Sequence, residues 1–200
     1  MGFSREQLEA ARHRSVPDLV GPHVRLLFVG INPGLWSAAA GAHFAHPGNR
    51  FYKALHSAGI ASGGSAEQPD PLDVRHGYDD AVVPALLERG IGITNLVERA
   101  TARAEELSAE ELREGALRLG EKVTEWRPEV VALVGVTAYR AAFGRRDADM
   151  GRQDEGLAGA ELWVLPNPSG LNAHYQLPDL ARLYRQAAEA AGLELGPLRM

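Results

Sequence analysis

An apolar segment at residues 24–29 runs directly into the loop Gly-Ile-Asn-Pro-Gly-Leu at residues 30–35, and this junction narrows the choice of fold more than any other stretch. The segment has the length and the β-branched and aromatic content of a buried strand. In the loop, Gly30 and Gly34 let a ligand approach the backbone closely, and the proline fixes the backbone angle. Only Asn32 offers a polar side chain. We therefore expect a rigid turn at a strand end that can hold a planar polar ligand.

Three further apolar segments have the character of strands: residues 91–96, 130–135 and 162–165. Helical signals separate them at residues 5–13, 49–57, 84–88, 108–127, 137–143 and 178–191. Parallel strands joined by helices need crossover connections, and the uninterrupted apolar run at 130–135 predicts burial on both sheet faces. We expect an α/β fold, a three-layer α/β/α sandwich with a short, mainly parallel, four-stranded central sheet. It forms a single domain, residues 1–200, with an N-terminal helical extension at residues 1–20.

A second loop, Leu-Pro-Asn-Pro-Ser-Gly-Leu at residues 165–171, again follows an apolar strand. The segment at residues 41–52 is rich in aromatic and histidine side chains, although the chain as a whole is only 6% aromatic. In open α/β sheets the ligand crevice lies at the carboxyl ends of the strands. Both loops fall at such ends, so we expect them to form one site.

The composition limits the possible partners and surroundings. There is no cysteine, which excludes disulfides and thiolate chemistry, and we see neither a membrane-spanning run nor a signal peptide, so we expect a cytoplasmic protein. The formal net charge of -5 is unfavourable for binding nucleic acid. The 21 basic residues can nevertheless form a local positive surface. Candidate clusters are Arg99 with Arg103, and Arg145 with Arg146 and Arg152.

Three motifs together resemble one known family: GINPGL at residues 30–35, FAHPGNRF at residues 44–51 and NPSGL at residues 167–171. The family is that of the mismatch-specific uracil-DNA glycosylases, bacterial relatives of thymine-DNA glycosylase, and the likeness spans residues 24–183. It implies a monofunctional DNA glycosylase that flips uracil out of G·U mismatches in double-stranded DNA and hydrolyses its N-glycosidic bond, leaving an abasic site. Thymine in G·T mismatches and ethenocytosine are further candidate substrates.

The resemblance also assigns roles to residues around the first loop. Asn32 positions the attacking water, and because an amide cannot take up a proton at neutral pH, a slow enzyme follows. The base-binding residues are Ile31, Gly34, Ser37, His43 and Phe44. Among these, Phe44 stacks on the flipped base, and the Ser37 hydroxyl lies near C5, where it disfavours the methyl group of thymine. His43 either faces the base or caps the loop.

The second loop is expected to contact the DNA duplex. By resemblance, Leu171 fills the space left by the extruded base, and backbone groups of Gly170 and Asn172 contact the guanine left unpaired on the opposite strand. Asn167 and Ser169 belong to the same contact. One departure from the family is the neutral Asn95, at a position that is often charged in relatives, so a catalytic or phosphate-binding role there is in doubt.

Three alternatives remain open on the sequence. The enzyme could favour other lesions, such as ethenocytosine or xanthine, or it could be a non-catalytic lesion binder. A phosphoryl-transfer protein is disfavoured because no Lys-Ser or Lys-Thr follows the glycine loop. His43 and His46 lack an obvious third ligand, so we expect no metal and no cofactor. We also expect a monomer without a protein partner and without membrane attachment.

Overall fold

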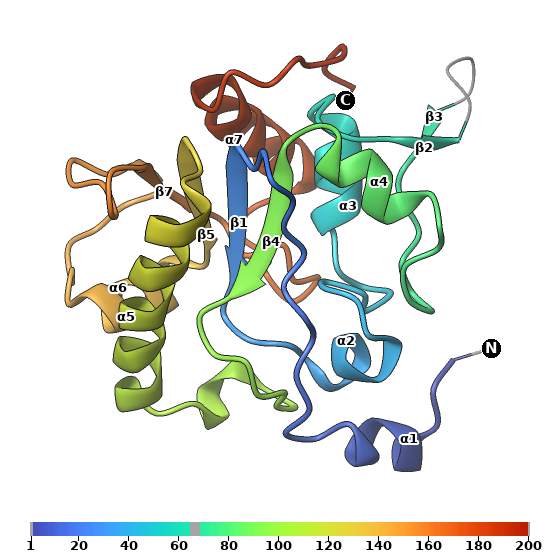
Figure 1. Cartoon of the computed structure of the whole chain (residues 1–200). Helices are drawn as coiled ribbons and strands as arrows, with labels where there is room; N and C mark the ends of the chain where they lie inside the picture. Colours follow the sequence, from blue (N-terminus) through green and yellow to red (C-terminus); the bar gives the residue numbers. More distant parts are fainter. Residues whose placement is uncertain (1, 65–68, 200) are drawn as a thin grey trace.

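The computed structural model describes residues 2–64 and 69–199, in which a central sheet is flanked by helices (Figure 1). The helices are α1 (Arg5–Ala10), α2 (Leu35–Ala40), α3 (Phe51–Ser57), α4 (Val82–Leu87), α5 (Ala109–Trp126), α6 (Val136–Phe143) and α7 (Leu177–Ala190), with a 3-10 helix, η1 (Ala104–Glu106). The strands are β1 (Leu26–Gly30), β2 (Gly63–Gly64), β3 (Pro69–Asp70), β4 (Ile91–Asn95), β5 (Val130–Val134), β6 (Gly151–Arg152) and β7 (Glu161–Leu165). None of the helices in the described ranges is both long and apolar enough to cross a bilayer.

The main sheet has five strands in the order β4-β1-β5-β7-β6. The four apolar segments predicted from the sequence are the parallel strands β1, β4, β5 and β7, whereas β6 pairs antiparallel with β7. The expectation of a four-stranded sheet is therefore wrong by one strand. Strand β6 contains only Gly151 and Arg152, which is too short to leave a period-2 pattern in the sequence.

Alternate residues of β1 contribute to two hydrophobic cores on opposite faces of the sheet. Leu26 and Phe28 pack in the core shared with α3 and α7, while Leu27 and Val29 pack in the core shared with α5 and α6. In Figure 1, α5 and α6 lie to the left of β1, and α3 and α4 lie to its right. Every residue of β1, β4 and β5 is buried, as expected for parallel strands covered on both faces.

The helix ends follow the local sequence signals where such signals exist. Ser108 and Glu111 form the predicted capping box at the start of α5, with bonds of 3.1 and 2.8 Å. The Asn49 side chain accepts a hydrogen bond from the Phe51 amide at the start of α3. Helix α2 was not predicted. It begins within the first loop, with Gly34 as its cap and no side-chain cap, so no side-chain signal marks its start, although the left-handed Gly41 marks its end.

The four parallel strands end at one edge of the sheet. Gly30 at the end of β1 pairs with Asn95 at the end of β4, and Val134 at the end of β5 pairs with Leu165 at the end of β7. The loops that follow these residues therefore come together at this edge. This is the position expected for a ligand crevice.

The N-terminal segment at residues 14–19, called the N-terminal strap below, covers the outer edge of β4. Leu19 and Ile93 exchange two backbone hydrogen bonds of 2.9 and 2.7 Å, and the Arg14 carbonyl accepts from the Ala100 amide at 2.8 Å. An edge strand presents unpaired backbone groups, and the strap satisfies part of them. The segment expected to be a simple helical extension thus reaches the loop that follows β4.

Candidate functional site

A cavity of about 190 Å³ opens where β1, β4 and β5 end. Most residues singled out in the sequence line it, from both loops: Ile31, Asn32, Gly34, Ser37, His43, Phe44, Asn167 and Ser169. Gly170, Leu171 and Asn172 do not line it. Sites for drug-sized ligands usually measure roughly 300–1,000 Å³. The cavity is therefore suited to a group smaller than a drug-sized ligand.

The Asn32 amide is held in one orientation by the loop after β4. Its Nδ2 donates to the Arg99 carbonyl at 3.0 Å and to Thr101 Oγ1 at 2.8 Å. The Thr101 hydroxyl donates its own hydrogen to the Arg103 carbonyl at 2.8 Å, so toward Asn32 it can only accept. Both acceptors require the NH₂ group of Asn32 on this side.

The opposite end of the amide remains available to a ligand. Among the described residues no donor is bonded to Asn32 Oδ1, and this oxygen is not one of the fully buried atoms. Asn32 itself is half-buried and lines the cavity. The fixed amide thus offers a hydrogen-bond acceptor, which is the group needed to orient a water molecule.

The backbone of the first loop is tied to the segment after β4. The carbonyls of Gly30, Ile31 and Pro33 accept from the amides of residues 96, 97 and 101, at 2.9, 2.9 and 3.2 Å. A Cβ on Gly30 would overlap the Asn95 side chain, whereas a Cβ on Gly34 would meet nothing within 4 Å. Gly30 is therefore needed for packing inside the protein, whereas no packing contact requires a glycine at residue 34.

Phe44 occupies a strained position in the wall of the cavity. Its φ of 55° lies in the left-handed region, which bulky residues rarely adopt. The ring stacks on Phe51 with centroids 4.1 Å apart and an interplanar angle of 19°. Because Phe51 is fully buried, one face of Phe44 is held against a rigid support. Strain of this kind persists only where the surroundings enforce it, and it is concentrated at functional sites.

Ser37 lies in α2 and is buried at the cavity wall. Its Oγ accepts a hydrogen bond of 3.1 Å from the Ala45 amide, which follows Phe44 directly in the chain. The hydroxyl therefore holds the segment that carries Phe44. This structural role is additional to any contact with a ligand, and sequence reasoning did not anticipate it.

His43 is buried and uses both ring nitrogens inside the protein. Nε2 lies 2.9 Å from the Pro17 carbonyl and Nδ1 lies 3.2 Å from Asn95 Nδ2. Burial lowers the pKa of His43 from its usual 6.5 to about 4, so the ring is neutral near pH 7. Neither nitrogen is left to face a base or to bind a metal. Asn95, which the sequence left in doubt, lines the cavity beside it.

The second loop carries an exposed apolar side chain on a tightly packed base. Leu171 is 96% exposed. A Cβ on Gly170 would lie 2.5 Å from the Gly48 carbonyl oxygen, so only glycine allows the two loops to pack this closely. Asn167 Oδ1 accepts from the Ser169 amide, and Asn172 Nδ2 donates to the Asn167 carbonyl, both at 3.0 Å. The loop is thus organised by its own amide side chains.

Arg50, which sequence reasoning did not single out, clamps this second loop. Its guanidinium donates to the carbonyls of Ser169, Asn172 and Tyr175 at 2.7, 2.9 and 2.8 Å. Its backbone amide donates to the Pro168 carbonyl at 2.9 Å. Arg50 directly precedes the helix that holds Phe51, so one short segment supports both the loop and the Phe44 ring.

Replacing Arg50 by methionine is expected to loosen the second loop, because Met keeps much of the side-chain volume but cannot donate to the three carbonyls. Hydrogen exchange of the amides at residues 169–175 should accelerate by at least about tenfold, since hydrogen bonds to charged groups contribute more than neutral ones. Arg185→Met is the matched control, because Arg185 binds the carbonyls of Ala58 and Gly196 elsewhere. Equal exchange in the two variants would contradict the clamp.

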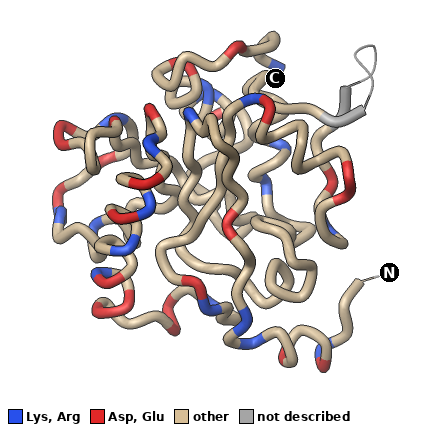
Figure 2. Tube along the Cα trace, viewed as in Figure 1, with Lys and Arg blue, Asp and Glu red and all other residues tan. Residues whose placement is uncertain are grey.

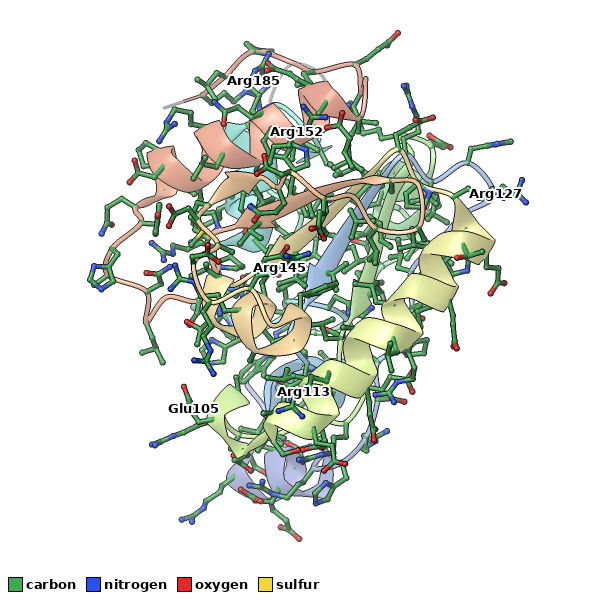
Figure 3. The ribbon with its side chains drawn as sticks, turned by 90° about the vertical axis from the view of Figure 1, so that its left-hand side faces the viewer. Glu105, Arg113, Arg127, Arg145, Arg152 and Arg185 are labelled. Carbon is green, nitrogen blue, oxygen red and sulfur yellow. The ribbon has the colours of Figure 1, made fainter. Side chains whose placement is uncertain are left out.

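Ion pairs neutralise much of the proposed positive surface. Several of its arginines are paired: Arg99 with Glu111, Arg145 with Glu155 and Arg152 with Glu161. Basic and acidic residues alternate along α5 in Figure 2, and in Figure 3 Arg145 lies near α6, whereas Arg152 lies near α7. Phosphate binding by these two clusters stays a prediction and would require the pairs to exchange partners.

A larger open groove of about 930 Å³ adjoins the cavity and shares Ile31 and Asn167 with it. Apolar residues of α6 form part of its wall, and Glu105, Asp149 and Asp179 add carboxylates. Within the described residues there is no cluster of three or more His, Asp or Glu side chains that could hold a metal. The smaller cavity likewise has no carboxylate among the described residues that line it.

Comparison with known proteins identifies the family and the fold of this chain. A family model described as the uracil DNA glycosylase superfamily matches residues 17–190. A solution NMR structure from Methanosarcina acetivorans, described as that of a "putative Uracil DNA glycosylase", superposes with a TM-score of 0.57 at 17% sequence identity. The match covers 88% of this chain and 98% of the other, and at this identity it establishes a shared fold.

Proposed function

Because the chain belongs to the uracil DNA glycosylase superfamily, we propose that it excises uracil from G·U mismatches in double-stranded DNA. The products are free uracil and an abasic site. Thymine in G·T mismatches and ethenocytosine are further candidate substrates. The mismatch preference rests on the resemblance of the three motifs to the mismatch-specific members of the superfamily.

The observation that carries this proposal is the fixed Asn32 amide. Two acceptors hold its NH₂ group, so its carbonyl oxygen is the free end in a cavity the size of a base. An acceptor at this point can bind a hydrogen of a water molecule and direct the water oxygen toward the sugar. Among the residues that the structure describes, no carboxylate lines the cavity to act as a strong base. The proposed reaction is therefore hydrolysis by a positioned water.

In the proposed reaction the bond between C1′ of the deoxyribose and N1 of uracil breaks. Positive charge develops on the sugar and negative charge on the departing base. The oxygen of the water molecule bonds to C1′, its proton passes to solvent, and uracil leaves as an anion. Donors aimed at the uracil oxygens lower this barrier, because they act in a site from which most water is excluded.

The base is expected to lie against Phe44, whose other face is supported by Phe51. Backbone N–H groups of Ile31 and Gly34 are the proposed donors to the uracil carbonyls, since a Cβ on Gly34 would meet open space. Asn95 adds a side-chain amide to the same wall. Stacking between aromatic groups and hydrogen bonding along one base edge is the usual way to hold a flipped base.

The exposed Leu171 is the proposed wedge. An apolar side chain at a loop tip can occupy the place of an extruded base, while backbone groups of Gly170 and Asn172 face the opposite guanine. Opening a wobble pair costs less free energy than opening a Watson-Crick pair. A G·U pair is therefore an easier substrate than A·U.

Ser37→Ala is expected to raise excision from G·T relative to G·U by several-fold, because it removes the hydroxyl proposed to crowd the thymine methyl. The same change leaves the buried Ala45 amide without its acceptor, which costs about 1–3 kcal/mol of stability. Rates on both substrates should fall while their ratio shifts. The Ser57→Ala variant is a control, since Ser57 is also buried but does not line the cavity. An unchanged ratio of G·T to G·U excision in Ser37→Ala would mean that Ser37 does not face C5 of the base.

The proposed activity is tested with labelled duplexes that contain G·U, G·T, A·U, G·ethenocytosine or xanthine, and with single-stranded uracil DNA. Alkali cleaves each abasic product, so strand breakage measures base release. We expect G·U to react fastest. Faster release of ethenocytosine or xanthine would assign the site to other lesions. Tight binding without any release in a single turnover would indicate a lesion binder.

A further inference from the structure

The bonds of His43 define which of its nitrogens carries the hydrogen. A carbonyl oxygen can only accept, so the 2.9 Å contact with Pro17 requires a hydrogen on Nε2. A neutral imidazole has one N–H, which leaves a lone pair on Nδ1. The group 3.2 Å from Nδ1 is therefore a donor, and Asn95 must direct its NH₂ toward the ring. The Asn95 amide therefore donates to His43, and His43 donates to the Pro17 carbonyl.

This direction determines what Asn95 can offer to a ligand. One N–H of its amide is used by His43, and the second N–H and the carbonyl oxygen remain. Uracil presents the acceptor O4 beside the donor N3–H, whereas cytosine presents an amino donor beside the acceptor N3. An amide that is fixed in one sense cannot reverse to suit the other base. We propose that His43 is a positioning residue that, held by the Pro17 carbonyl, fixes the sense of the Asn95 amide and thereby favours uracil over cytosine.

The N-terminal strap supplies the carbonyl on which this arrangement depends. Pro17 precedes Asp18, whose Oδ1 accepts from Thr94 Oγ1 at 2.5 Å, and Lys122 pairs with Asp18 at 2.7 Å. The next residue, Leu19, is bonded to β4. The strap and β4 are thus fastened on both sides of Pro17 and Asn95. The family match begins at residue 17, so half of the strap precedes it.

The surroundings keep the ring neutral and in place. The His43 amide donates to the Tyr78 hydroxyl at 3.1 Å, and its carbonyl accepts from the Tyr52 hydroxyl at 3.0 Å. Asp18 and Lys122 are the charged groups that act on the ring, with opposite effects, and burial outweighs both. Burial also raises the pKa values of Tyr52 and Tyr78, so these hydroxyls stay protonated as well. A second hydrogen on Nδ1 would face the Asn95 donor and break the arrangement.

The first test measures the tautomer directly. Long-range ¹H–¹⁵N spectra distinguish the two neutral forms of histidine and the imidazolium, and the His43→Gln variant identifies the resonances among the 7 histidines. We expect the neutral form with hydrogen on Nε2 at pH 7. Hydrogen on Nδ1, or an imidazolium, would overturn the proposal. This measurement needs no substrate.

The second test asks whether His43 acts through Asn95, and it rests on the proposed uracil excision. Glutamine can still donate to Pro17 but cannot place an acceptor at Nδ1. We expect His43→Gln and Asn95→Ala each to slow uracil release about tenfold, and the double variant to be no slower than Asn95→Ala alone. If the two losses of rate multiply in the double variant, His43 does not act through Asn95.

The preference for uracil over cytosine distinguishes a positioning role of His43 from a general loss of protein stability. Uracil and cytosine are each placed opposite an abasic site, so that neither has a pairing partner, and the two release rates are compared. We expect the preference for uracil to narrow in His43→Gln, whereas general destabilisation would lower both rates equally and leave it unchanged. If the wild-type protein released no uracil, the proposed function would fail, and the tautomer measurement would still decide the position of the hydrogen.

Discussion

The variant Asn32→Ala is expected to release uracil at least about 100-fold more slowly than the wild type, the usual loss when a group that acts on the reacting proton or water is removed. Binding to a G·U duplex should change little, because the side chain faces the cavity rather than the wedge loop. Single-turnover rates measure the first effect, and fluorescence anisotropy with a labelled duplex measures the second. A rate near that of the wild type would exclude Asn32 from positioning the water.

Thr101→Val provides a graded comparison for Asn32. Valine matches threonine in shape but removes the oxygen that accepts from Asn32 Nδ2 at 2.8 Å. The amide keeps its bond to the Arg99 carbonyl, so it should be less well fixed but still present. We expect a loss of activity smaller than that of Asn32→Ala. No loss at all would mean that the hydroxyl does not orient the amide.

Asn32→Asp is not a conservative change at this position. A carboxylate has no N–H to donate, and one of its oxygens would face the Arg99 carbonyl where Nδ2 now lies at 3.0 Å. Two acceptors in contact repel each other, so the side chain must rotate or take up a proton. The protein is thus built around an amide.

Leu171→Ala is expected to slow excision from G·U duplexes by about tenfold or more, because the shortened side chain cannot fill the gap left by the extruded base. Unstacking a base costs a few kcal/mol, roughly, and the wedge offsets part of it. On an unpaired, single-stranded uracil the loss should be much smaller. Equal losses on the two substrates would remove the wedge role from Leu171.

The exposure of Leu171 makes this comparison unusually direct. At 96% exposed it contributes almost no packing, so the variant should melt at the temperature of the wild type. Leu117→Ala is a matched control, since Leu117 is 74% exposed on α5. It removes the same atoms from a surface helix outside both loops. Excision should be unaffected in that control.

The asparagines show how much of the cavity lining could be predicted from the sequence. The chain has five, and Asn32, Asn49, Asn95 and Asn167 all line the cavity, with Asn172 in the adjoining loop. Two of these, Asn32 and Asn167, lie in motifs that follow apolar strands, so their convergence was predictable from parallel pairing. Asn95 also lies near the end of a predicted strand, but no local pattern points to the His43 ring against which its amide is fixed.

The elements that were predicted correctly are those favoured by interactions between residues that are close in the chain. Apolar runs of strand length, a capping box at Ser108 and glycines at turns act on neighbouring residues, so residue order alone reveals them. The short β6 and the start of α2, which has no side-chain cap, carry no such local signal. Each is held by groups that are distant in the chain, and only the packed protein brings those groups together.

The sequence by itself determined the parallel strands, the α/β class, the edge where the two loops meet and the identity of the side chains there. Only the tertiary structure decided how those side chains are oriented. The Asn32 amide depends on Thr101, the second loop depends on Arg50, and the His43 ring depends on the Pro17 carbonyl. Hydrogen-bond direction is set by the partner, and each of these partners is distant in the chain or is a backbone group that any residue could supply.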